Sequence, residues 1–151
     1  MTIEDFVVQI WRGLSPLFQN SRGLSPLSPQ DLLHYGHITG WLEDQDEAHP
    51  KAQIDRRTVA RIIHQFMKLE LHIKDNPDIS SAEVLKDLYT CRVCANHVAQ
   101  VYVKGLIDCE EVTDPSSGAT VQIFNMLAPF SEEETERLVK AIQCEVLNLH
   151  N

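Results

Sequence analysis

The sequence lacks the features that mark secreted and membrane proteins. Its N-terminus, Met1 to Phe6, has no basic segment followed by an apolar one, so no secretory signal is visible. The longest apolar runs are a few residues, far short of a membrane span. We therefore expect a cytoplasmic protein, whereas a chain trimmed at its N-terminus would be compatible with the cell surface.

Cysteine and positive charge are also scarce. Four cysteines in 151 residues are too few for a disulfide scaffold, and without a secretory signal we expect them to be reduced. Lysine and arginine number 13 against 22 aspartates and glutamates, which gives a formal charge of −9. This acidic balance argues against a broad nucleic-acid interface, because such an interface needs clustered positive charge.

Sequence motifs of the common enzyme classes are missing as well. The chain has no spacing that indicates a serine–histidine–aspartate arrangement, no phosphate-binding loop and no glycine-rich dinucleotide motif. We therefore predict a non-catalytic protein without a cofactor.

Helical periodicity is what the sequence does contain. Apolar residues recur every three to four positions in the segments 3–12, 55–71, 92–104 and 131–148. A further helix begins at Ser28 and is expected to stop at Gly36, and a capping box predicts a short helix over 84–88. Strand signals are nearly absent apart from an extended piece at 120–124. We predict a mainly α fold with a minor β piece.

Two stretches of the chain follow the same order of features. Each has a helix, a glycine stop, an apolar plug, a loop and a capped amphipathic helix. The glycine stops align at Gly36 and Gly105, and the capped helices begin near Ile54 and Phe130. One such unit cannot bury its apolar face alone, so the two are expected to pack on each other. The predicted organisation is an N-terminal helix with a turn-rich segment, a first repeat and a second repeat, at 1–27, 28–74 and 80–151.

This order resembles the S-layer homology repeat. In that family a helix is followed by Gly-Ile-Ile-x-Gly, a proline-containing loop and Ile-Thr-Arg at the start of a second helix. The first unit has Gly36-His-Ile-Thr-Gly40, then Pro50, then Ile54-Asp-Arg-Arg-Thr58, and the second keeps Lys104-Gly-Leu-Ile107. The resemblance implies a helical spindle, in which 1–27 would be a degenerate third repeat.

The same resemblance implies a binding module. In the family, grooves between repeats hold an acidic cell-wall polysaccharide, and the motif arginine, here Arg56, contacts its anionic groups. The expected ligand-binding residues are Arg56, Arg57 and Trp41. Glu132 stands at the corresponding place in the second unit and should repel an acidic glycan there, so a protein partner is the other candidate. Two repeats should also leave apolar surface exposed, which predicts a homodimer.

Cys91-Arg-Val-Cys94 with His97 is the sharpest local pattern. On one helical face these side chains could bind zinc with Cys109 as a fourth ligand. Near a helix N-terminus Cys91 could instead act as a redox thiol. A single Cys-x-x-Cys also fits ordinary buried cysteines. The sequence leaves the three alternatives open.

Charged residues gather at two predicted helix ends. Three arginines crowd the first turns of one helix, namely Arg56, Arg57 and Arg61. They could serve an anion or pair with the acidic run at 43–47. His34 and His37 lie at another helix end, where they could bond free carbonyl groups or ligate a metal.

Overall fold

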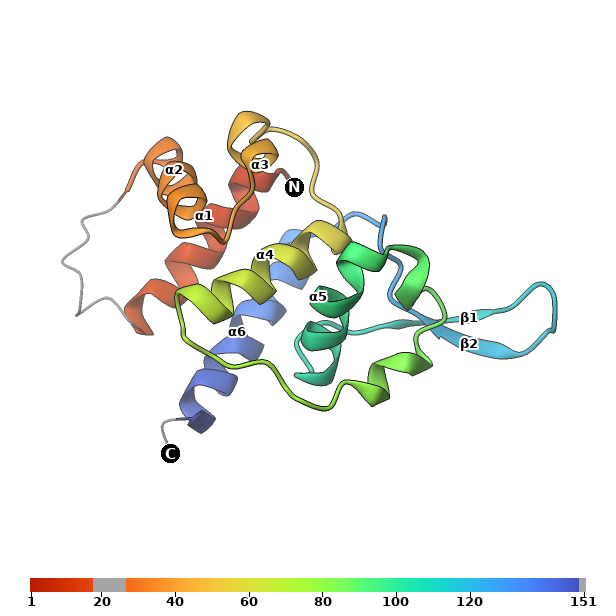
Figure 1. The fold of residues 1–151 in the computed structure, drawn as a ribbon. Helices are drawn as coiled ribbons and strands as arrows, with labels where there is room; N and C mark the ends of the chain where they lie inside the picture. The colour runs from red at the N-terminus through yellow and green to blue at the C-terminus, as the bar shows by residue number, and fades with distance from the viewer. Residues whose placement is uncertain (18–26, 150–151) are drawn as a thin grey trace.

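The computed structural model describes residues 1–17 and 27–149. Within these residues the chain forms six α-helices and one antiparallel β-hairpin, so the predicted mainly α fold with a minor β piece is confirmed (Figure 1). The helices are α1 (Ile3–Leu14), α2 (Pro29–Thr39), α3 (Asp44–Ala48), α4 (Arg56–Leu69), α5 (Arg92–Val103) and α6 (Glu132–Leu149). The strands are β1 (Glu110–Thr113) and β2 (Thr120–Ile123), and the hairpin projects away from the helices (Figure 1).

Side-chain caps start the helices where the sequence placed them. In α1, α2, α4 and α6 the oxygen of the capping residue accepts the backbone N–H three residues later. The capping residues are Thr2, Ser28, Asp55 and Ser131. Each bond satisfies a donor that the first helical turn would otherwise leave free, which is why these boundaries could be read locally.

The predicted end of α2 is wrong. The helix continues past Gly36 to Thr39 and ends at Gly40, whose φ of 105° favours glycine. Gly36 lies inside the helix because the loop packs closely on it. A Cβ there would lie 2.7 Å from Cδ1 of Leu42 and 2.9 Å from Cη2 of Trp41.

The predicted helix over 84–88 is also wrong. Two 3-10 turns, η3 (Ser80–Val84) and η4 (Leu88–Thr90), flank this stretch instead. Between them the Asp87 carboxylate accepts the N–H groups of Phe124 and Asn125, both at 2.8 Å. The end of β2 therefore holds this segment, rather than helical bonds of its own.

One cluster of buried apolar side chains extends through both halves of the chain. Phe6 of α1 packs edge-on against Phe130, with ring centroids 6.1 Å apart, and Trp41 packs edge-on against Phe66 of α4 at 5.0 Å. The two predicted repeats thus share one core. No helix in the described ranges is long and apolar enough to cross a membrane.

The N-termini of α1, α4 and α6 are linked by a repeated set of backbone bonds. The first two N–H groups of α1 donate to carbonyls before α4, and the first two of α4 donate to carbonyls before α6. The pairs are Ile3 to Ala52 (3.0 Å), Glu4 to Pro50 (2.9 Å), Arg56 to Ala128 (2.9 Å) and Arg57 to Met126 (2.8 Å). In both sets the acceptors lie three and five residues before the next capping residue. The two junctions are therefore built the same way, and Figure 1 shows the N-terminus beside the segment that enters α4.

Candidate functional site

A cleft of about 420 Å³ lies between α4 and the first turn of α5. We call it the α4–α5 cleft. Its lining comprises Glu43, Gln45, Arg57, Thr58, Arg61, Cys91, Val93, Cys94 and His97. A larger groove of about 580 Å³ runs beside α1 and α6, but four of its lining residues are acidic and it holds none of the predicted site residues. The α4–α5 cleft is the candidate site because it joins elements from both halves.

Arg56 does not face this cleft, which corrects the prediction that it contacts a ligand. The residue is buried, and its guanidinium lies 4.8 Å from the centroid of the Phe124 ring. Nε donates to the Phe124 carbonyl at 2.7 Å, Nη1 donates to Glu134 at 3.0 Å, and Nη2 donates to the Asp108 carbonyl. Arg56 therefore ties α4 to the second half of the chain.

Trp41 is likewise internal, which corrects its predicted place on the contact surface. The residue is buried, and its Nε1 donates to Oε1 of Glu70 at 3.2 Å. Its ring packs between Phe66 and Tyr35. Trp41 closes the core under the loop that follows α2.

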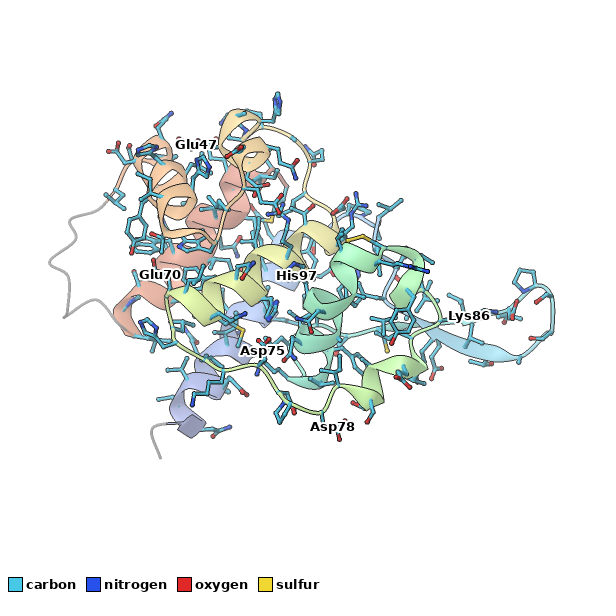
Figure 2. The ribbon with its side chains drawn as sticks, viewed as in Figure 1. Glu47, Glu70, Asp75, Asp78, Lys86 and His97 are labelled. Carbon is cyan, nitrogen blue, oxygen red and sulfur yellow. A yellow bond between two sulfur atoms is a disulfide. The ribbon has the colours of Figure 1, made fainter. Side chains whose placement is uncertain are left out.

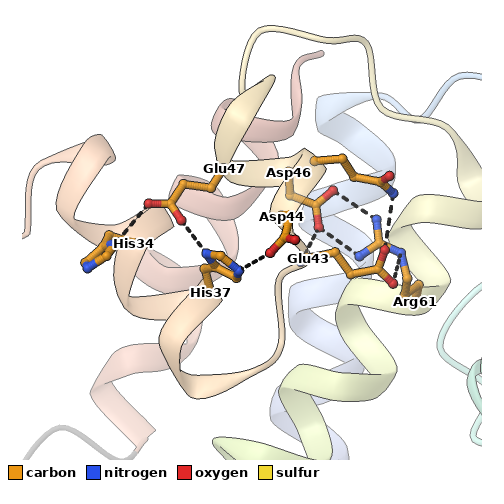
Figure 3. Close-up of polar contacts among 8 residues, drawn as sticks. His34, His37, Glu43, Asp44, Asp46, Glu47 and Arg61 are labelled. Carbon is orange, nitrogen blue, oxygen red and sulfur yellow. Dashed lines mark hydrogen bonds and ion pairs between the residues drawn. The ribbon is translucent and has the colours of Figure 1, made fainter.

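Arg61 faces the cleft but is already paired. Its two Nη atoms donate to the two carboxylate oxygens of buried Asp46 at 2.8 and 2.9 Å (Figure 3). Burial is the largest single influence and acts to lower the pKa of Arg61, but the hydrogen bonds and charge of Asp46, together with the charges of Glu43 and Asp55, raise the pKa. Glu43 adds a longer contact at 3.7 Å. Pairing with the acidic run, one of the two predicted alternatives, is thus confirmed for Arg61.

Arg57 is the predicted site residue that remains open to a ligand. Its side chain is 43% exposed, and it forms an ion pair at 3.7 Å between its Nη2 and Oδ2 of Asp55. The backbone N–H groups at the start of α4 are taken by the carbonyls before α6 and by the Asp55 cap. An anion in the cleft would therefore meet the Arg57 guanidinium rather than the end of this helix.

Cys91 and Cys94 form a disulfide in the wall of the cleft, whereas the sequence predicted reduced thiols. Their Cα atoms lie 5.2 Å apart, inside the usual range for a disulfide. Cys109 lies elsewhere and donates from Sγ to Oε1 of Gln122 at 3.2 Å. Among residues 1–17 and 27–149 no three histidine, cysteine or acidic side chains are grouped to hold a metal ion. The structure thus brings Cys91, Cys94 and His97 to one cleft and leaves Cys109 outside it.

His97 ends a chain of three hydrogen-bonded side chains. His64 is buried, its Nε2 lies 2.7 Å from Oδ1 of Asp75, and its Nδ1 lies 2.7 Å from Nδ1 of His97. Figure 2 labels the two ends of the chain, Asp75 and His97, beside α4. Burial is the largest single influence and acts to raise the pKa of Asp75, but the hydrogen bond from His64 and the nearby charges together lower the pKa.

Hydrogen bonding constrains the ring protons of this chain. An ionised carboxylate only accepts, so Nε2 of His64 carries the hydrogen that bonds Asp75. One hydrogen lies between Nδ1 of His64 and Nδ1 of His97, and Nε2 of His97 lies outside this bond. Burial is the largest cause that lowers the pKa of His97 to about 4, so this ring is neutral at pH 7. Sequence reasoning named His97 but not its partners, because His64 is 33 residues away.

His34 and His37 bond carboxylates on α3 rather than helix carbonyls (Figure 3). Glu47 accepts from His34 at 2.8 Å and from His37 at 2.5 Å, and Asp44 lies 2.5 Å from the other ring nitrogen of His37. The bond to Glu47, followed by the bond to Asp44, raises the pKa of His37. Bonds from His34 and then His37 lower the pKa of Glu47. This exposed cluster docks α3 against α2.

Comparisons with family models, with curated proteins and with solved structures find no match for this chain. Its function therefore has to be inferred from the cleft and from the order of its elements.

Proposed function

We propose that this chain is a non-catalytic binding module of the S-layer homology type, which binds a carboxylate-bearing polysaccharide in the α4–α5 cleft. The observation that carries the proposal is the position of Arg57. Its guanidinium belongs to the lining of a concave site, is 43% exposed and has a carboxylate partner only at 3.7 Å. Guanidinium groups with free donors suit carboxylates, because two parallel N–H groups match the two carboxylate oxygens.

Other features of the cleft support an anionic sugar as the ligand. The chain as a whole is acidic, with a formal charge of −9, whereas two arginines line the α4–α5 cleft. The first turn of α5 has no side-chain cap and no acidic residue, and its Cys91, Val93 and Cys94 line the cleft. The positive end of that helix favours negative charge nearby. Val93, 85% exposed, offers an apolar surface for a sugar ring.

The repeated junction between helices supports the family resemblance. The bonds from α1 to the segment before α4 have the same spacing as the bonds from α4 to the segment before α6. Asp55 caps α4 at the place of the family's threonine, and Thr2 and Ser131 cap α1 and α6. In this proposal α1 is the remaining helix of a degenerate third unit, so three capped helices form the spindle.

Binding to a pyruvylated cell-wall polysaccharide tests the proposal. Arg57→Gln is expected to weaken binding at least about tenfold, which corresponds to about 1.4 kcal/mol, and to make it less sensitive to salt. Arg137→Gln, an exposed residue of α6 outside the cleft, is the matched control and should bind like the wild type. The same polysaccharide without its pyruvate groups should bind only weakly to the wild type and to both variants. Equal affinity of wild type and Arg57→Gln, or no binding by the wild type, would overturn the proposal and favour a protein partner.

A further inference from the structure

The disulfide in the α4–α5 cleft has one partly exposed and one buried cysteine. Cys91 is the capping residue of α5 and is partly exposed, whereas Cys94, one turn into the helix, is 8% exposed. Thiol–disulfide exchange needs one sulfur that an attacking thiolate can reach, and the difference in exposure directs the attack to Cys91. We propose that Cys91 and Cys94 form a thiol–disulfide exchange site, in which a small-molecule or protein thiol reacts at Cys91.

The charges around the cleft favour thiolate sulfur. Arg57 and Arg61 line it from α4, Glu43 from the turn before α3 and neutral His97 from α5. Glu43 contacts Arg61, and the first turn of α5 contains no acidic residue. Thiols at helix N-termini beside cationic groups have pKa values of about 3.5 to 7.5, against about 8.5 for a free cysteine. The thiolate is both the attacking and the leaving form in exchange, so this setting suits the reaction.

His97 is positioned to stabilise the reduced form. It lies three residues after Cys94, so the two side chains are neighbours on one face of α5, and both line the cleft. Nδ1 of His97 is bonded to His64, and within the described residues no hydrogen bond involves its Nε2. Nε2 is therefore available to form a hydrogen bond with Cys94 once the disulfide is open. We therefore treat His97 as a positioning residue.

The exchange moves two electrons from two thiols to the disulfide. A partner thiolate attacks Sγ of Cys91 and forms a mixed disulfide, while the Cys91–Cys94 bond breaks and its electron pair leaves on Cys94. Cys94 takes up the proton that the partner thiol released. A second partner thiolate attacks the partner's sulfur, and Cys91 leaves as a thiolate and is protonated in turn. The products are the protein dithiol and the partner's disulfide.

Equilibration with glutathione tests the site in the intact chain. At pH 7 we expect the Cys91–Cys94 bond to open and close reversibly across buffers of different reduced-to-oxidised glutathione ratio, with unchanged circular dichroism. In Cys94→Ser, glutathione should be found on Cys91. In Cys91→Ser, adduct on the buried Cys94 should be at least about tenfold less, read by peptide mass spectrometry. The background Cys109→Ser with Cys144→Ser removes the two free cysteines. A disulfide that stays closed in 10 mM reduced glutathione, or equal amounts of adduct on Cys91 and Cys94 in the two variants, would indicate a purely structural disulfide and overturn the proposal.

Alkylation of the reduced protein is a second, independent measurement. A thiol with a pKa near 7 instead of 8.5 has about thirty times more thiolate at pH 6. Its thiolate is intrinsically less nucleophilic, which reduces the gain in rate by about a factor of five. We therefore expect iodoacetamide to modify Cys91 about fivefold faster than exposed Cys144 at pH 6. Loss of the hydrogen bond to Cys94 in His97→Leu should shift the glutathione equilibrium about fivefold toward the disulfide, with no change in the far-ultraviolet spectrum. Equal alkylation rates at Cys91 and Cys144 would overturn the proposal.

Discussion

Arg56 and Arg57 are adjacent in the sequence but have opposite environments. Arg56 is buried and bonds two carbonyls and one carboxylate, whereas Arg57 is 43% exposed in the cleft. The first side chain therefore belongs to the interior and the second to the surface. A substitution at each position separates the two roles.

Arg56→Ala should destabilise the protein strongly. The change leaves Glu134 and the carbonyls of Phe124 and Asp108 without their guanidinium donor, and removing one partner of a buried pair costs about 3 to 5 kcal/mol. Urea unfolding followed by circular dichroism measures the loss. Arg57→Ala is the control and should stay within about 0.5 kcal/mol of the wild type, because it is a surface substitution. If both variants unfold at the same urea concentration, the structural role assigned to Arg56 is wrong.

The sequence could predict the caps but not the environment of Arg56. A cap involves a residue and the N–H three positions later, so Asp55 was readable from local pattern alone. The partners of Arg56 lie 68, 78 and 52 residues away. Only the tertiary fold brings them together, and the position of an arginine near a helix start looks the same whether it is buried or exposed. The hydrogen bond between His64 and His97 was not predictable either, because these residues are also far apart in the sequence.

At the scale of elements, α3 is the part of the fold that local reasoning did not foresee. The run at 43–47 was interpreted only as an acidic segment that could pair with arginines. It forms a helix because Glu43 and Asp46 cap each other's backbone and because two histidines of α2 bond Glu47. A five-residue helix has little stability of its own, so these contacts across elements determine it.

The docking of α3 on α2 predicts a pH dependence. The pKa of His37 is raised in the fold by Glu47 and Asp44, so the folded state holds a proton that the unfolded chain releases near its ordinary value of about 6.5. The stabilisation is fully present below about pH 6.5 and is lost as pH rises through the folded pKa. The melting temperature of the wild type should therefore fall more between pH 6 and 8.5 than that of His37→Gln.

His49→Gln serves as the control for this comparison, because His49 ends α3 outside the hydrogen-bonded cluster. It should retain the wild-type pH dependence in differential scanning calorimetry. A wild type and a His37→Gln variant with parallel curves would contradict the role of His37. The lowered pKa of Glu47 acts in the other direction, since its contribution is lost as pH falls below about 4.5.

At the scale of the whole molecule, the order of the elements was predictable from the sequence, but the alignment of the two repeats, residue by residue, was not. Each half has a helix, a glycine stop, a loop and a capped helix, as the pattern indicated. The glycines with left-handed backbone at the helix ends are Gly40 and Gly105, with φ of 105° and 70°, so Gly36 was the wrong partner for Gly105. The choice between Gly36 and Gly40 depends on the close packing of Trp41 and Leu42 on Gly36, which spacing alone does not reveal.

The repeated junction also makes α1 part of the common fold. Its first N–H groups bond the segment before α4, and its Phe6 packs on Phe130 at the start of α6, so the three capped helices should unfold together. Phe6 is fully buried, and Phe6→Ala should cost about 3 to 5 kcal/mol. Amide hydrogen exchange should show lower protection in α4 and α6 as well as in α1, whereas Arg12→Ala on the exposed side of α1 should leave protection unchanged. Loss of protection confined to α1 would mean that this helix is an appendage, and the proposed three-helix spindle would then be wrong.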